Sequence, residues 1–499
     1  MEGSIWVLLV ALLVFGTSLL FHRFIEGRVE ILRLPMTWFY SSWLFGLALL
    51  ALPLYKYFEA FTASTASYVL AILFASSLGS ITAAFWTKYR MRSRPLNFED
   101  DEAQLKEPSM RWLFVLLISG LIGTSLVTLN TFLGGSLSIG ERLDADNLSA
   151  IRSATQVLEA SRIGILHGPA NFLWSIGGLG VAYVSYMAGA RTALSKRNRR
   201  LYFLAASVLT FNIFLGVVGF GGRVLAVFAI LGALIAFSEG RWSIGERLIS
   251  RKPDFKSVLT LLVASVLATN VLWAASTSFL EKRVQGMDPQ ALLMRTHRAS
   301  LSPIIYDLTR GTLPAQYLMF TISYMTTPIP TLVFYLDLPQ SRQAGPYFGE
   351  YNFPAIARWV RRLTFSGDPL AWDRQRYEIF KPLADINFGT NVWSTLVRDL
   401  IADFGKYGAL VFVFALSFYA QRSVDIQRSR PSVQRAGLLV HLRLLMLFSG
   451  LVSILFQPQF HWSLYLAVFL TSIAGQTPQK ALRKNAARAL PLASRDRRS

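Results

Sequence analysis

The sequence predicts an all-α protein that is embedded in a membrane and crosses it many times. Of its 499 residues, 53% are apolar and only 16% are charged, which is more apolar surface than a soluble domain of this size can bury. Apolar runs of about 20 residues, the length that crosses the hydrocarbon core, recur along the chain. Cysteine is absent from the sequence and histidines number five, so disulfides and thiolate metal sites are excluded.

Eleven such runs predict eleven transmembrane helices. The first has neither a basic leader nor a small-residue cleavage site after it, so it predicts a retained span rather than a signal peptide. Each run is read as one helix because its length and hydropathy match a bilayer crossing. The runs lie at about 4–21, 35–54, 66–87, 112–133, 169–190, 201–219, 224–238, 257–278, 407–421, 438–456 and 462–476.

The basic residues predict the orientation, because Lys and Arg flank short loops on the cytoplasmic side. If successive spans alternate in direction, the segments on the same side of the membrane as the carboxyl terminus hold 30 of the 50 basic residues. We therefore expect an inner-membrane protein with its amino terminus on the outer side and a basic cytoplasmic tail, 477–499. The net charge of +21 then reflects topology, so no nucleic-acid partner is expected.

The segment 279–406 is too long for a simple connection between two spans, so it predicts a separate, mostly helical periplasmic loop domain. Within them, the apolar stretch 315–336 contains Pro328 and Pro330, which predict a re-entrant or interfacial element rather than a span. A shorter outer segment, 134–168, has an amphipathic pattern and is expected to lie along the membrane. The predicted domains are thus residues 1–278 with eight spans, 279–406, and 407–476 with three spans.

Arginines on the outer side are the first candidates for chemistry, because the guanidinium fork binds phosphate and carboxylate oxygens in a bidentate way. Arg223 follows two glycines at the start of a span, where it can face a headgroup or pyrophosphate. Pairing with the acids of the same region is the alternative interpretation for each of them. The other outer arginines are Arg295, Arg298, Arg310, Arg342, Arg358, Arg361, Arg362, Arg374, Arg376 and Arg398.

Aromatic residues are interleaved with these arginines. Aromatic faces stack on sugar rings, and Tyr and Trp also anchor at membrane interfaces, so the mixture fits either a carbohydrate groove or a lobe that lies on the membrane. The aromatic residues are Tyr347, Phe348, Tyr351, Phe353, Trp359, Phe365, Trp372, Tyr377 and Phe380.

The run NVWSTLVRDLIADFGKYG at 391–408 leads into the ninth predicted span. Asp399 and Asp403 are four residues apart, so on a helix they share one face with Arg398 nearby. Carboxylates near the outer interface can act as a general base or orient an arginine; the alternative is an ion cluster that holds the outer domain to the bundle. Arg443, in the tenth predicted span, is expected to snorkel to the inner surface.

These features resemble the bacterial oligosaccharide repeat-unit polymerases, the O-antigen polymerase family. The resemblance implies a GT-C-like bundle that transfers the growing glycan from undecaprenyl pyrophosphate to the non-reducing end of a new lipid-linked repeat unit. The product would be an O-antigen, a capsule or an exopolysaccharide. The matching residues are Asn391, Val392, Trp393, Ser394, Asp403, Phe404, Gly405 and Gly408, together with Gly221 and Gly222 before Arg223.

The resemblance also implies a glycosyltransferase that needs no metal and no cofactor, because the pyrophosphate is already a good leaving group. It implies a catalytic role for Asp399, Asp403 and Arg223. The implied partners are the undecaprenyl-pyrophosphate-linked oligosaccharide, the lipid bilayer and a chain-length regulator protein. The residues expected to bind the pyrophosphate or the glycan are Arg295, Arg298, Arg310, Arg374, Arg376, Arg398 and Asn391.

Two alternatives share the architecture of many spans. An O-antigen ligase hands the finished glycan to a lipid A core. A polysaccharide flippase or transporter is expected to show internal repeats and charged groups near the midplane, whereas the candidate residues of this chain lie in the outer domain.

Overall fold

The structure is a computed structural model. It describes residues 2–27, 30–57, 61–93, 110–133, 167–190, 196–214, 223–243, 288–310, 312–339, 345–353, 395–429, 431–454 and 462–473, with single positions between them (343, 378, 379, 381, 382, 385 and 460). The segments 134–166, 257–278 and 477–499, which carry three of the predictions, lie outside the described residues.

Helices make up most of the described chain, and two short strands form a ribbon. The shorter elements are the 3-10 helix η1 (Ile31–Arg33), α11 (Pro289–His297), α12 (Pro303–Thr309), α13 (Leu313–Thr326), α14 (Pro328–Asp337), β1 (Tyr55–Tyr57) and β2 (Ala299–Leu301). The longer helices are α1 (Glu2–Glu26), α2 (Pro35–Ala51), α3 (Ala63–Ser93), α4 (Met110–Leu133), α7 (His167–Gly189), α8 (Lys196–Phe214), α9 (Arg223–Ser243), α17 (Leu396–Ser429) and α18 (Val433–Phe448).

Five helices in the described ranges are long and apolar enough to cross a membrane. They confirm the prediction of a helical membrane protein. Two shorter apolar helices lie at Arg200–Ile213 and Trp462–Ile473. Described helices overlap every predicted run except 257–278. The five long segments are Ser4–Glu26, Ala63–Tyr89, Arg111–Leu129, Pro169–Gly189 and Leu396–Ser429.

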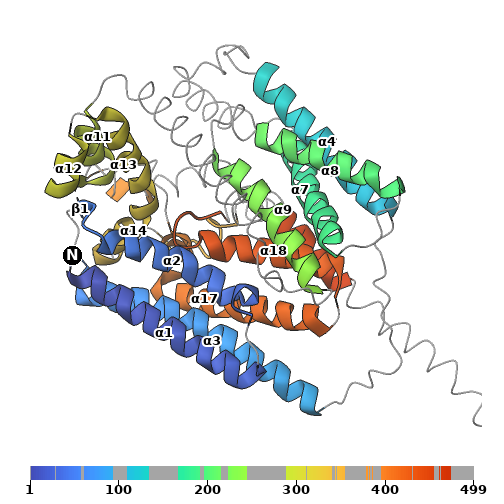
Figure 1. The fold of residues 1–499 in the computed structure, drawn as a ribbon, viewed down its shortest axis with the longest axis horizontal. Helices are drawn as coiled ribbons and strands as arrows, with labels where there is room; N and C mark the ends of the chain where they lie inside the picture. The colour runs from blue at the N-terminus through green and yellow to red at the C-terminus, as the bar shows by residue number, and fades with distance from the viewer. Residues whose placement is uncertain are drawn as a thin grey trace, which may run out of the picture.

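The long helices form two groups in space. Helices α1, α3 and α17 lie side by side, and α4, α7, α8 and α9 form a second group (Figure 1). Helix α18 contacts both groups, and α2 packs against α18 and the first group. Small residues allow the closest crossings: a Cβ added at Gly79 would clash with the backbone of Phe414, and one at Gly120 would clash with Gly177. Such small residues are typical of helix contacts in membranes, where close van der Waals packing supplies much of the attraction.

Helices α11–α13 and the β1–β2 ribbon form a lobe at one end of the bundle (Figure 1). Strand β1 lies in the connection between α2 and α3, and it pairs antiparallel with β2 so that Tyr55 is opposite Leu301. The hydroxyl of Tyr55 donates to the carbonyl of Met319, and that of Tyr57 bonds to the Thr326 hydroxyl. Part of the predicted outer domain is therefore fixed at the end of the bundle where α2 ends and α3 begins.

The proline-containing stretch 315–336 forms two helices that meet at Thr327. Pro328 occupies the first turn of α14, where its missing N–H has no helical partner to lose. Most side chains of α14 are buried, and Ile329, Leu332 and Tyr335 join the main core. With 14 and 10 residues, neither helix reaches across a hydrocarbon core of about 30 Å.

Candidate functional site at the start of helix α17

A break at Gly405 separates the first turns of α17 from the rest of the helix. Gly405 has φ 71° and ψ 175°, a conformation that interrupts the helical hydrogen-bond ladder and that glycine adopts at low cost. Before the break, the Thr395 hydroxyl accepts the N–H of Arg398 at 3.1 Å and so caps the helix. The N–H of Leu396 donates to the carbonyl of Ser449 at 2.9 Å, which fixes this segment to the end of α18.

Arg398 and Asp399 form a buried ion pair in this first segment. The guanidinium NH2 lies 3.4 Å from Asp399 Oδ1, and both side chains are 0% exposed. The structure thus holds a guanidinium and a carboxylate together, away from solvent, in the run 391–408.

Asp403 is bound by a different kind of partner. Its Oδ1 accepts the N–H of Tyr351 at 3.0 Å, and its Oδ2 accepts the N–H of Asn352 at 2.9 Å and the side-chain amide of Asn352 at 2.7 Å. The side chains of Asp403 and Asn352 are both buried. The carboxylate therefore tethers the turn that contains Tyr351 and Asn352 to the beginning of α17.

Backbone hydrogen bonds strengthen the same attachment. The N–H of Tyr347 donates to the carbonyl of Ala402 at 3.1 Å, and that of Phe348 donates to the carbonyl of Asp403 at 2.8 Å. Gly345 has a φ of +97°, and a Cβ at this position would clash with Ala402, so only glycine permits the close approach. We call residues 345–353, held by these bonds and by the Asp403 carboxylate, the Asp403 clasp.

The first turns of α9 contact the end of α18. The ring of Phe228 packs edge-on against Phe448, with 4.5 Å between ring centroids, and Phe448 precedes the Ser449 that anchors Leu396. Arg223 begins α9 five residues before Phe228, or about 7.5 Å along the helix axis. The structure describes the backbone of Arg223 and not its side chain.

The other arginines proposed from the sequence are distributed differently. Arg298 is half-buried and ends α11 in a left-handed conformation with φ 45°, while Arg310 is exposed after α12. Both lie on the lobe of α11–α13. Arg295 lies in α11, but its side chain lies outside the described residues, as do Arg374, Arg376 and Asn391 entirely.

Two titratable side chains, His297 at the end of α11 and Tyr347 of the Asp403 clasp, have shifted pKa values. Burial lowers the pKa of His297 to about 3, and its Nδ1 lies 2.9 Å from the Thr327 hydroxyl. Burial, together with a 2.6 Å hydrogen bond to the Glu378 carboxylate, raises the pKa of Tyr347. Both groups are therefore neutral at physiological pH. Among the described residues, no group of three or more His, Asp or Glu side chains is arranged to hold a metal ion.

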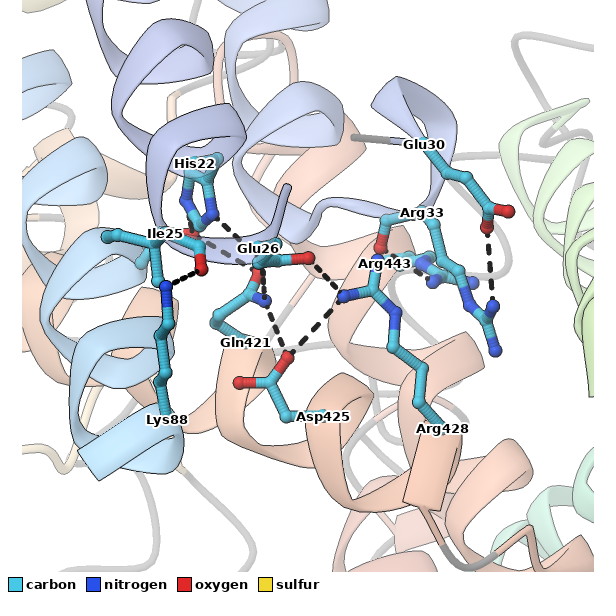
Figure 2. A network of polar contacts seen from close by, with 11 residues as sticks. His22, Ile25, Glu26, Glu30, Arg33, Lys88, Gln421, Asp425, Arg428 and Arg443 are labelled. Carbon is cyan, nitrogen blue, oxygen red and sulfur yellow. Dashed lines mark hydrogen bonds and ion pairs between the residues drawn. The ribbon is translucent and has the colours of Figure 1, made fainter. Parts of the chain in front are cut away.

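A second buried polar network, at the opposite end of the bundle, was not found from the sequence (Figure 2). His22 on α1 lies 3.1 Å from Glu26 and 3.0 Å from the Ser80 hydroxyl on α3. Gln421 on α17 donates to Glu26 at 3.4 Å and to Asp425 at 2.9 Å. Arg428 pairs with Glu26 and lies 3.7 Å from Asp425. We call this set the inner network.

Arg443 corrects one expectation. It does not snorkel to the surface, because it is 0% exposed and pairs with Glu239 of α9. Its NH2 also donates to the carbonyl of Arg33 at 3.1 Å, and the guanidinium packs over the rings of Trp38 and Trp242. The prediction was wrong because Glu239, which is distant in sequence, pairs with Arg443 in the interior. The guanidinium therefore does not need to reach water.

No protein-family model, curated protein or solved structure matches this chain. Function is therefore inferred from the residues of the site, from their geometry and from the motif that contains them.

Proposed function

We propose that this chain is a bacterial inner-membrane glycosyltransferase that polymerises lipid-linked oligosaccharide repeat units. The observation that carries the proposal is the buried Arg398–Asp399 pair beside the clasped Asp403 at the start of α17. These residues belong to the run 391–408, which resembles the O-antigen polymerases, and Arg223 belongs to the second motif that does so. In the proposed topology the chain has eleven spans, a periplasmic amino terminus and a cytoplasmic carboxyl terminus.

The proposed reaction is a displacement at the anomeric carbon of the growing glycan. A hydroxyl at the non-reducing end of the new repeat unit attacks that carbon, and the bond to the pyrophosphate oxygen breaks. The hydroxyl proton passes to the Asp399 carboxylate, and undecaprenyl pyrophosphate leaves as an anion. Arg223 and Arg398 stabilise the charge that develops on the leaving diphosphate, so no nucleotide is required.

Asp403 has a positioning role in this proposal, because both of its oxygens already accept hydrogen bonds from the clasp. Its function is to hold the outer domain against α17 while substrate is bound. The remaining arginines, Arg295, Arg298, Arg310, Arg374 and Arg376, together with Asn391, are proposed to contact the pyrophosphate or the glycan.

The direct test is to incubate the purified protein, in lipid nanodiscs, with the lipid-linked repeat unit of the producing cells. A ladder of longer glycans supports a polymerase. Product that forms only when a lipid A core acceptor is added identifies a ligase. Movement of the lipid-linked sugar across proteoliposomes without chain growth identifies a transporter.

Arg223 provides a residue-level test in cells. Arg223→Ala is expected to leave surface glycan one repeat long while the protein is produced at a normal level. Lys56→Ala is the matched control, because Lys56 is an exposed basic residue on β1 at the same end of the bundle. Retention of long chains by Arg223→Ala excludes Arg223 from the site.

A further inference from the structure

Phe348 combines two unfavourable features. Its φ is +53°, a left-handed conformation that bulky L-residues rarely adopt, and its side chain is 81% exposed. An exposed ring gains no packing energy in return for the strained backbone. Such strain persists only where the surrounding structure imposes it, and it is concentrated at functional sites.

The Asp403 clasp imposes the conformation. The N–H of Phe348 donates to the carbonyl of Asp403, and the neighbouring N–H of Tyr347 donates to that of Ala402. Three residues later, the Asp403 carboxylate binds the turn at Tyr351 and Asn352. The backbone is thus fixed on both sides of Phe348, and the ring is held outward in one place beside the proposed reaction centre.

The surroundings of Phe348 differ from those of a lipid-facing aromatic residue. Tyr407, which is 86% exposed, begins an exposed row on α17 that continues at four-residue spacing through Val411, Ala415 and Tyr419. This row has the pattern of a helix face in contact with lipid, with a tyrosine at the interface. Phe348 does not belong to the row, because it lies on the clasp.

Polar groups border the clasp around Phe348. The Tyr347 hydroxyl donates to the exposed Glu378 carboxylate at 2.6 Å, and Glu350 follows two residues after Phe348. A hydrocarbon chain placed here would desolvate these carboxylates at a cost, whereas sugar hydroxyls can donate hydrogen bonds to them. An exposed aromatic ring on a clasp that is bordered by a carboxylate is therefore suited to a carbohydrate ring.

We infer that Phe348 is a stacking platform for a sugar ring of the lipid-linked glycan, next to the carboxylates of α17. This inference rests on the proposed function and identifies one contact of the same site. The rigid clasp holds the ring in its binding position before the glycan arrives, which reduces the entropy lost on binding.

Three variants at one position test it. Phe348→Gly removes the ring and relieves the strain, since glycine takes a positive φ readily, so its thermal stability should equal or exceed that of the wild type. Phe348→Tyr keeps an aromatic face. Phe348→Leu keeps an apolar side chain without a ring. Phe203→Leu, at a 76% exposed phenylalanine on α8, is the matched control.

Two ligands are tested for binding to the protein in nanodiscs. One is undecaprenyl pyrophosphate, and the other is the same lipid carrying the repeat unit. Phe348→Gly and Phe348→Leu should weaken binding of the sugar-bearing lipid roughly fivefold to tenfold and leave binding of the bare lipid unchanged. Phe348→Tyr and Phe203→Leu should bind both lipids as the wild type does. Full binding by Phe348→Leu, equal losses for both lipids, or no loss in Phe348→Gly would overturn the inference.

The binding readout does not depend on chain growth. If the wild type fails to elongate glycan but Phe348→Gly loses the sugar-dependent part of binding, the proposed polymerase activity is wrong and the sugar contact stands. If the wild type elongates glycan and Phe348→Gly binds normally, the platform is wrong and the activity stands.

Discussion

The two ends of the bundle both bury charged side chains, but they pair them differently. In the inner network, His22, Glu26, Asp425 and Arg428 are bonded mainly to other side chains, on helices that are far apart in sequence. At the start of α17, the Asp403 carboxylate is bonded to backbone N–H groups and an amide of one short turn. Side-chain pairs hold helices to one another, whereas the clasp fixes a loop, and with it Phe348, beside the candidate reaction centre.

The largest effect is expected from the buried pair of Arg443 and Glu239. Glu239→Gln leaves the guanidinium of Arg443 buried without its countercharge, which typically costs about 3–5 kcal/mol. The double variant Glu239→Leu with Arg443→Met removes both charges and should recover most of this loss. Thermal unfolding in detergent measures both. If the double variant is no more stable than Glu239→Gln, the ion pair of Arg443 and Glu239 does not stabilise the protein.

A smaller and more local effect is expected when the clasp is opened. Asp403→Ala leaves the two N–H groups and the amide that it binds without an acceptor. Because the opened clasp lets water reach these groups, the loss is expected to be about 1–3 kcal/mol, the cost of one unmade buried hydrogen bond. We expect rapid protease cleavage near residues 345–353, while the helices of the inner network keep their protection. Asp403→Asn, which retains one acceptor oxygen, should be intermediate. Uniform loss of protection at both ends would mean that the clasp is not a separate unit.

The pH dependence of the lobe of α11–α13 is expected to come from His297. Its folded pKa of about 3 lies below the ordinary value near 6.5, so the unfolded chain binds the extra proton between these values. Stability is therefore complete above pH 6.5 and falls as the pH is lowered toward 3, by roughly 2 kcal/mol at pH 5. Thermal unfolding at pH 7 and pH 5 tests this, and His297→Gln should show a smaller difference. An equal difference in both proteins would assign the effect to other groups.

The smallest change in stability is expected at Gly405. Gly16 is the comparison, because both glycines have open space around them. A Cβ at Gly405 or at Gly16 meets no atom within 4 Å, but only Gly405 has a positive φ. Gly405→Ala should therefore cost about 1–2 kcal/mol through backbone strain alone, whereas Gly16→Ala in α1 should gain about 0.5–1 kcal/mol. Chemical unfolding curves give both values. Similar changes in the two variants would show that the break in α17 is not set by Gly405.

The sequence predicted the helices well because each apolar run carries its own signal. It also identified Arg398, Asp399 and Asp403 as a group, because these residues are close together in the chain and i, i+4 spacing is a local property. The partners of Asp403 could not be predicted in the same way. Tyr351 and Asn352 precede it by about fifty residues, and no local pattern marks an asparagine as the donor to a particular carboxylate.

The inner network was missed for a related reason. His22, Glu26 and Arg428 each stand near the basic end of a predicted span, where a polar residue is expected to face water or headgroups. Only the packing of α1 against α3 and α17 brings them together in the interior. Arg443 was misinterpreted because the hydropathy pattern alone does not show that Glu239 reaches it.

The β1–β2 ribbon has a consequence for how the chain is made. Tyr57 pairs with Ala299 and Tyr55 with Leu301, so about 240 residues are synthesised between the two strands. At about 5–20 residues per second, the second strand emerges tens of seconds after the first. During that interval the connection between α2 and α3 has already been made while its partner strand does not yet exist. Completion of this end of the protein must therefore wait for late translation, and a nascent chain halted before residue 299 would leave the edge of β1 open to other chains.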